Sequence, residues 1–107
     1  MDENYLFFTK LINFVRLIRG DSFWNAQIVQ IDVSTPARGA GQVHWQEPEV
    51  EIVPRVGRHV VLLGTLDEVE QKLDRLMLFY RRVLDYEGWE TYRTVNLKYR
   101  NQVVCTK

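Results

Sequence analysis

Few residues of this chain could do chemistry. The best candidates for a general base, a nucleophile or a metal ligand are His44, His59 and Cys105. No nucleophile elbow, paired His-x-x-x-His or glycine-rich phosphate loop accompanies them. The spacing of the two histidines matches no common metal site, even with carboxylates added. We therefore expect structural histidines, no cofactor, no metal and a protein that is not an enzyme.

A mixture of basic and aromatic residues could stack and hold a single nucleic-acid strand. Fourteen basic residues balance fourteen acidic ones, however, so no net field attracts a polyanion. Nucleic-acid binding is therefore kept as the alternative function, and a steep salt dependence of oligonucleotide binding would support it. The residues in question are Arg75, Arg81, Arg82, Arg93, Tyr92 and Tyr99.

Length and composition predict one ordinary globular domain. The chain has 107 residues, of which 46% are hydrophobic and 26% charged. Its one cysteine cannot form an internal disulfide. The longest apolar stretch, 6–18, is interrupted by polar residues, so neither a membrane span nor a signal peptide is predicted.

Two amphipathic helices are predicted to pack on the sheet. In 4–19, apolar residues recur at spacings of three and four and place Phe8 and Ile12 in the buried stripe. The apolar arc of this helix is wider than one sheet face needs, so the helix either sits deep in the fold or meets a missing neighbouring segment, and we favour the missing segment. The second helix spans 65–87, where Thr65 and Glu68 have the spacing of a capping box.

Strands are predicted between and after these helices. The first spans 26–34, with Val29, Ile31 and Val33 on one face. A turn-rich loop follows at 35–41, and a brief strand at 43–46. The segments 49–53 and 59–64 form a hairpin around Gly57, which supplies a positive φ angle.

The last strand is predicted from Thr94 to Cys105. Val95, Leu97 and Tyr99 share one face of it, and the other face is polar. A terminal strand often lies at a sheet edge with unpaired backbone groups. The alternative to a binding role is an ordinary edge or central strand whose polar face is solvated. The order helix, strand, strand hairpin, helix, strand predicts an α+β fold, a mixed or antiparallel sheet with two helices packed on it.

Several strings resemble a known family. They are 62–64, the helix 66–84, the strand 95–99, the opening 23–28 and the hairpin 53–57. Together they resemble the C-terminal β-domain of the FtsQ/DivIB bacterial cell-division proteins, most closely the Bacteroidetes branch. The resemblance covers roughly residues 14–107.

This resemblance implies a function without catalysis. Members of this family have a cytoplasmic tail, a membrane helix, a POTRA domain and then the β-domain. The chain is therefore expected to be a single-domain fragment of such a protein. It would act in septum formation on the extracytoplasmic, periplasmic side of the inner membrane. Its implied partners are FtsB/DivIC-like and FtsL-like division proteins, bound by addition of a strand to the C-terminal edge.

The resemblance also implies which residues bind the partner. Some members have Asp-Ser-Gly where this chain has 100–102, and an arginine where it has Thr65. The family's basic residue and tyrosine fall on Lys98 and Tyr99, and its pairing segment on 102–104. The expected partner-binding residues are Lys98, Tyr99, Arg100, Asn101, Gln102, Val103 and Val104.

Overall fold

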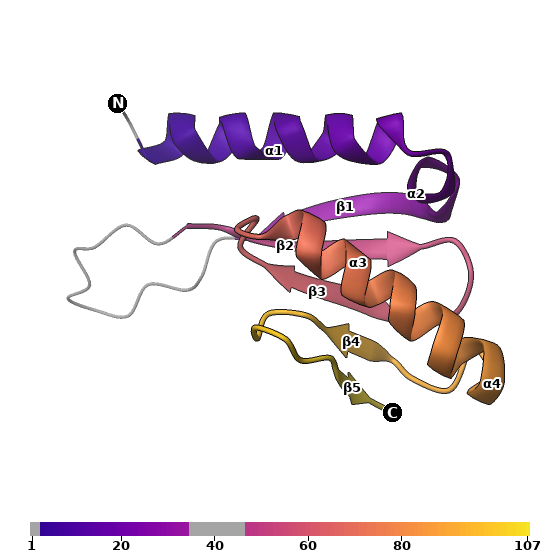
Figure 1. Cartoon of the computed structure of the whole chain (residues 1–107). Coiled ribbons are helices and arrows are strands. Elements are labelled where there is room, and N and C mark those ends of the chain that lie inside the picture. Colours follow the sequence, from indigo (N-terminus) through magenta and orange to yellow (C-terminus); the bar gives the residue numbers. More distant parts are fainter. Residues whose placement is uncertain (1–2, 35–46) are drawn as a thin grey trace.

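The fold is given by a computed structural model that describes residues 3–34 and 47–107. The predicted loop at 35–41, the predicted strand at 43–46 and His44 lie outside the described residues. The elements in chain order are α1 (Glu3–Gly20), α2 (Ser22–Gln27), β1 (Ile28–Ser34), β2 (Glu49–Pro54), β3 (Val60–Gly64), α3 (Val69–Phe79), the π-helical turn η1 (Tyr80–Leu84), α4 (Asp85–Glu87), β4 (Thr94–Asn96) and β5 (Val104–Thr106) (Figure 1).

The five strands form one sheet in the order β1-β2-β3-β4-β5. Neighbouring strands run antiparallel, except that β3 and β4 run parallel. A parallel pair needs a crossover connection, and the helical stretch from α3 to α4 supplies it. The predicted α+β fold with a mixed sheet is therefore confirmed.

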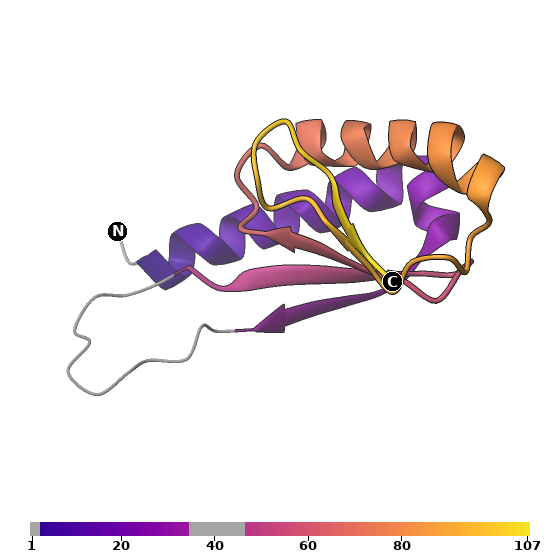
Figure 2. The same ribbon diagram turned by 90° about the horizontal axis from the view of Figure 1, so that it is seen from below.

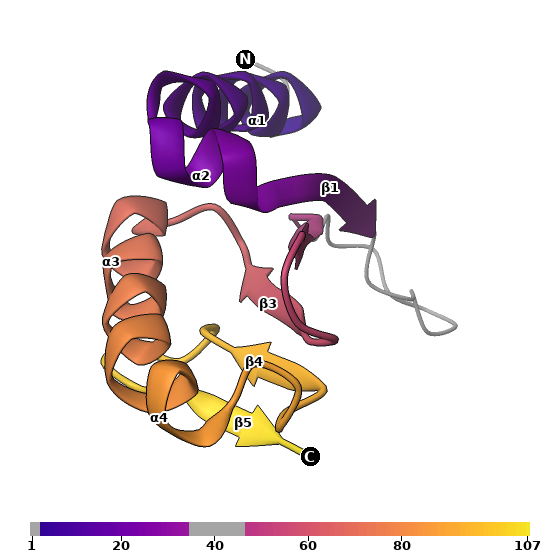
Figure 3. The same ribbon diagram turned by 90° about the vertical axis from the view of Figure 1, so that its right-hand side faces the viewer.

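The helices lie on one side of this sheet. Figures 2 and 3 show α1 and α3 over the same face, while no described helix covers the opposite face. Strand alternation sends the apolar side chains of the central strands towards the helices. The residues of that face that are at most 1% exposed include Val50, Ile52, Val61, Leu63 and Val95.

The apolar residues of α1 are divided between the core and the solvent. Phe14 and Ile18 are buried, whereas Phe8 and Ile12, which the periodicity places in the buried stripe, are 62% and 44% exposed. The stripe is wrongly centred because apolar residues occur around most of this helix, and periodicity then has no preferred direction. The expectation that a further segment covers α1 stays a prediction.

The start of β1 differs from the prediction. Residues 22–27 form the short helix α2, whose first amides, from Phe23 and Trp24, donate to the Asp21 carboxylate at 2.9 and 3.1 Å. The strand begins only at Ile28, and its register shifts between Ile28 and Gln30. Because of this bulge, Val29 is exposed and does not share the face of Ile31.

The predicted capping box is wrong. The helix α3 begins at Val69, and Glu68 before it has a φ of 55° and makes no capping hydrogen bond with its side chain. The Thr65 hydroxyl instead donates to Asp67 at 3.4 Å. The buried Lys72 donates to the carbonyls of Leu63 and Thr65, both at 2.8 Å. The connection is thus stabilised by a buried lysine, which no capping motif predicts.

The predicted strand from Thr94 to Cys105 is two strands, β4 and β5, joined by a turn. Leu97 is buried, but Tyr99 is 58% exposed and does not share its face. The strand ends because a side chain, and not a neighbouring strand, binds the next backbone amide. The Oδ1 of Asn96 accepts a hydrogen bond from the Lys98 amide at 2.9 Å. Period-two alternation continues through such a turn by coincidence, so it cannot show where a strand stops.

Candidate partner-binding edge

The strand β5 lies at one edge of the sheet. It pairs with β4 on its inner side, and within 3–34 and 47–107 no strand pairs with its outer side. Figure 1 shows β5 at the margin of the sheet, next to the C-terminus. An edge of this kind presents backbone donors and acceptors that another chain can pair with. The prediction of an edge position is therefore confirmed for β5 among the described residues, whereas β4, the first part of the predicted strand, lies inside the sheet.

The turn before β5 carries most of the predicted site residues. Tyr99 and Arg100 are exposed, and Asn101 takes the left-handed conformation with a φ of 58°. Asparagine tolerates this conformation better than most residues. Gln102 is exposed and Val103 half-buried, and both precede the strand. The structure therefore brings these residues together in one turn beside the edge.

Only Val104 of the predicted pairing segment lies in β5 itself. Its side chain is 44% exposed. The segment expected to pair, 102–104, thus overlaps the strand only at its last residue, because β5 spans 104–106. Cys105 and Thr106, which the prediction leaves out of the site, make up the rest of the edge.

Ion pairs fix the two basic residues of the turn. The Nζ of Lys98 lies 2.9 Å from a carboxylate oxygen of Glu49 on β2. Arg100 pairs with Glu68, which precedes α3. This bond holds the pKa of the Glu68 carboxyl below its usual range and raises that of the Arg100 guanidinium. The turn is thus joined to both the sheet and the helical layer.

Arg75 supports the same turn from α3. One of its guanidinium nitrogens donates to the Leu97 carbonyl at 3.1 Å and to the Tyr99 carbonyl at 3.4 Å. These two bonds occupy backbone acceptors that a continuous strand would have used. They hold the turn so that Tyr99 stays at the surface.

A shallow hollow of about 220 Å³ lies between this edge and the helix beside it. Its lining is mostly apolar, and Leu78 is 49% exposed there. Sequence reasoning missed this surface, although Arg75, Leu78 and Arg82 recur at spacings of three and four on one helix face. The residues that line the hollow are Arg75, Leu78, Phe79, Arg82, Val83 and Val103.

The candidate reactive residues His59 and Cys105 do not form a reactive site among the residues that the structure describes. His59 is 2% exposed, and its Nε2 is 2.7 Å from the Tyr80 hydroxyl. Its Nδ1 faces the Trp89 carbonyl without the alignment of a full hydrogen bond. Burial lowers the pKa of His59 and raises those of Tyr80 and the half-buried Cys105. Within 3–34 and 47–107, no three His, Cys, Asp or Glu residues cluster as metal ligands would.

The basic and aromatic mixture is partly used inside the domain. Arg75 supports the C-terminal turn, and the Tyr92 hydroxyl donates to Glu87 at 2.7 Å. These contacts occupy two of the groups that would have had to face a nucleic acid. The arrangement gives no support to the nucleic-acid alternative.

The comparisons with known proteins agree with the resemblance in the sequence. A family model described as FtsQ/DivIB, C-terminal related, matches residues 1–106. The searches of the curated proteins and of the solved structures give no match. Among the described helices, none is both long and apolar enough to cross a bilayer.

Proposed function

Because the chain belongs to the FtsQ/DivIB C-terminal related family of cell-division proteins, we propose that it is a non-catalytic interaction module of the division machinery. Its proposed partners are FtsB/DivIC-like and FtsL-like proteins. A segment of the partner adds as a strand to the outer edge of β5 and so helps to control septum formation. The outer edge of β5, with which no described strand pairs, is the observation that carries this proposal.

The neighbourhood of the edge supports strand addition. Main-chain hydrogen bonds to β5 would give affinity, and alternate side chains of the added strand would give selectivity. On the helix-covered side, these side chains would meet the apolar hollow at Leu78 and Val103. Arg75 and Arg82 at the same hollow favour carboxylates on the partner.

The turn before β5 is the proposed selectivity element. Tyr99 offers a largely exposed aromatic ring, and exposed tyrosines are enriched among residues that dominate binding energy. Arg100 stays exposed beside it although it pairs with Glu68. These features support the proposal that residues 98–102 contact partner residues that flank the added strand.

We also propose that the domain acts on the extracytoplasmic side of the bacterial inner membrane, attached by a membrane helix that precedes this part of the protein. This location rests on the family. It can be tested in cells that express the intact protein from its own gene. Protease added to spheroplasts should degrade the domain, whereas protection until detergent is added would refute the location.

Binding to the soluble part of the matching FtsB/DivIC-like protein tests the proposed mode. Tyr99→Ala should weaken binding about tenfold, a loss of about 1.4 kcal/mol that fits an aromatic residue beside the added strand. A matched control is Tyr5→Ala, because Tyr5 is 61% exposed and belongs to α1, which lies near the opposite edge of the sheet from β5. Binding should then be unchanged.

Removing 104–107 deletes β5 and should abolish binding, whereas removing Lys107 alone should not. Circular dichroism shows whether the shortened chain still folds. Full binding by the shortened chain, or equal loss with the Tyr99 and Tyr5 variants, would exclude strand addition at this edge.

A further inference from the structure

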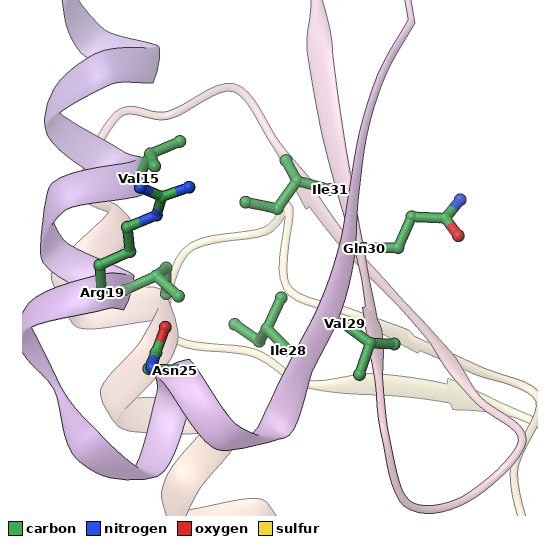
Figure 4. A pocket seen from close by; sticks show the side chains of 8 residues that line it. Val15, Arg19, Asn25, Ile28, Val29, Gln30 and Ile31 are labelled. Carbon is green, nitrogen blue, oxygen red and sulfur yellow. The ribbon is translucent and has the colours of Figure 1, made fainter.

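Among the described residues, the sheet has a second edge without a neighbouring strand at β1, on the opposite side from β5. Here a hollow of about 360 Å³ separates the strand from the C-terminal half of α1. Figure 4 shows Ile28 and Ile31 pointing from β1 towards α1, where Val15 and Arg19 line the opposite wall. Edge strand and helix thus form the two sides of a groove that mixes apolar side chains such as Ile28 and Ile31 with polar ones such as Arg19 and Asn25.

The backbone of β1 is available along its outer side. It pairs with β2 from Ile28 to Ser34, and in the part of the chain that the structure describes no strand pairs with its other side. Val33 is 45% exposed on this strand. Free backbone groups next to exposed apolar side chains are what an added strand needs.

Charges on the two sides of β1 indicate what such a strand would carry. On the face without helices, Asp32 lies directly opposite Glu51 of β2, and like charges in this position destabilise a sheet. A cation on a third strand beside Asp32 would relieve this repulsion. On the groove side, Arg19 has no ion pair with any residue that the structure describes. It therefore offers its charge to an anion.

We propose that β1 binds an extended peptide segment of a partner protein, which pairs antiparallel with Ile28–Ser34. The segment places apolar side chains in the groove, a lysine or arginine beside Asp32, and an aspartate or glutamate next to Arg19. Because Arg19 and Ile28 line the same hollow, this acidic residue lies at the C-terminal end of the segment. The site is separate from the edge at β5, so the sheet would be extended on both sides.

The probe is the synthetic peptide Thr-Val-Lys-Ile-Thr-Asp with a fluorophore at its N-terminus. Its second and fourth residues face the groove, its lysine lies opposite Asp32, and its aspartate reaches Arg19. In spectra of the ¹⁵N-labelled 107-residue protein, it should shift the amides of 28–34. Shifts confined to 104–106 or to the outer face of α1, or none at about 1 mM peptide, would overturn the proposal.

Charge exchange tests the orientation without disturbing the core, since Arg19 is exposed. Arg19→Glu should weaken binding about tenfold, and a peptide ending in lysine should regain the loss. The matched control Arg16→Glu also reverses an exposed charge on α1, but Arg16 does not line this hollow, so binding should change little. Equal effects of both variants, or no rescue, would show attraction by net charge alone and overturn the site.

Discussion

Buried polar side chains connect the central strands to the helices that cover them. The imidazole of His59, just before β3, lies 2.7 Å from the Tyr80 hydroxyl in η1. Lys72 of α3 donates to two carbonyls at the end of β3. Such groups cost free energy when they are buried without partners. Their hydrogen bonds therefore favour one position of the helical layer over the sheet.

The buried His59 should make stability depend on pH. Burial lowers its pKa in the folded protein, so the unfolded chain takes up a proton more readily. The free energy of unfolding should therefore be highest above the ordinary histidine pKa of about 6.5 and fall as the pH decreases below it. The slope is at most about 1.4 kcal/mol per pH unit.

Urea unfolding at about pH 7.5 and about pH 5.5 measures this slope. Both proteins carry His44→Gln, so that only His59 titrates among the histidines, and one of them also carries His59→Gln. The second should be less stable at the higher pH and should lose part of the pH dependence. An identical slope in both would assign the dependence to carboxyl groups.

Among the elements, the turn between β2 and β3 packs closely against the segment around Trp89. Gly57 in this turn has a φ of 93°, and a Cβ there would lie 2.7 Å from the Trp89 carbonyl oxygen and 2.9 Å from Nδ1 of His59. Gly64, at the end of β3, has a φ of 72°, but a Cβ there would lie 3.0 Å from the Cγ of Lys98, an exposed side chain and not the backbone.

These two glycines make a matched pair for substitution. Both alanine variants force a side chain into a left-handed backbone conformation, which costs about 1–3 kcal/mol. Gly57→Ala must in addition displace the backbone at Trp89, so it should lower the free energy of unfolding more than Gly64→Ala. Urea denaturation of the two variants measures the difference. Equal losses would mean that the backbone at Trp89 can move without lowering the free energy of unfolding.

The elements that sequence reasoning predicted well have one dominant signal. The hairpin around Gly57 has alternation on both sides and a glycine where φ is positive. The helix predicted from Thr65 has a long apolar stripe, and a helical course runs from 69 to 87. Periodicity over many residues averages out local exceptions, which is why these segments could be recognised.

The ends of helices and strands are predicted wrongly where tertiary contacts compete with the local sequence pattern. Lys72 supports the backbone at Thr65, so the helix starts later than the capping motif predicts. Arg75 and Asn96 end β4 within an alternating sequence. The hollow at Leu78 was missed because it exists only when the helix lies next to β5. The turn and the hollow depend on these long-range contacts, so the sequence could nominate candidate residues near β5 but could not predict the surface around them.

In the molecule as a whole, stability should be highest in the middle of the sheet. The central strands β2 and β3 have neighbours on both sides, and their core residues Ile52 and Val61 are at most 1% exposed. The two edge strands have a neighbour on one side only among the described residues. Local opening there exposes less apolar surface, so it costs less free energy than global unfolding.

Amide hydrogen exchange of the free protein should therefore be slowest in β2 and β3 and faster in β1 and β5. Binding of a partner segment along β5 should slow exchange at 104–106 and leave 28–34 unchanged, because the two edges are separated by three strands. Uniform protection across the sheet would mean that the edges open only with the whole domain. Protection at 28–34 on binding at β5 would instead show that the sheet couples its two edges, and each edge would then influence the affinity of the other.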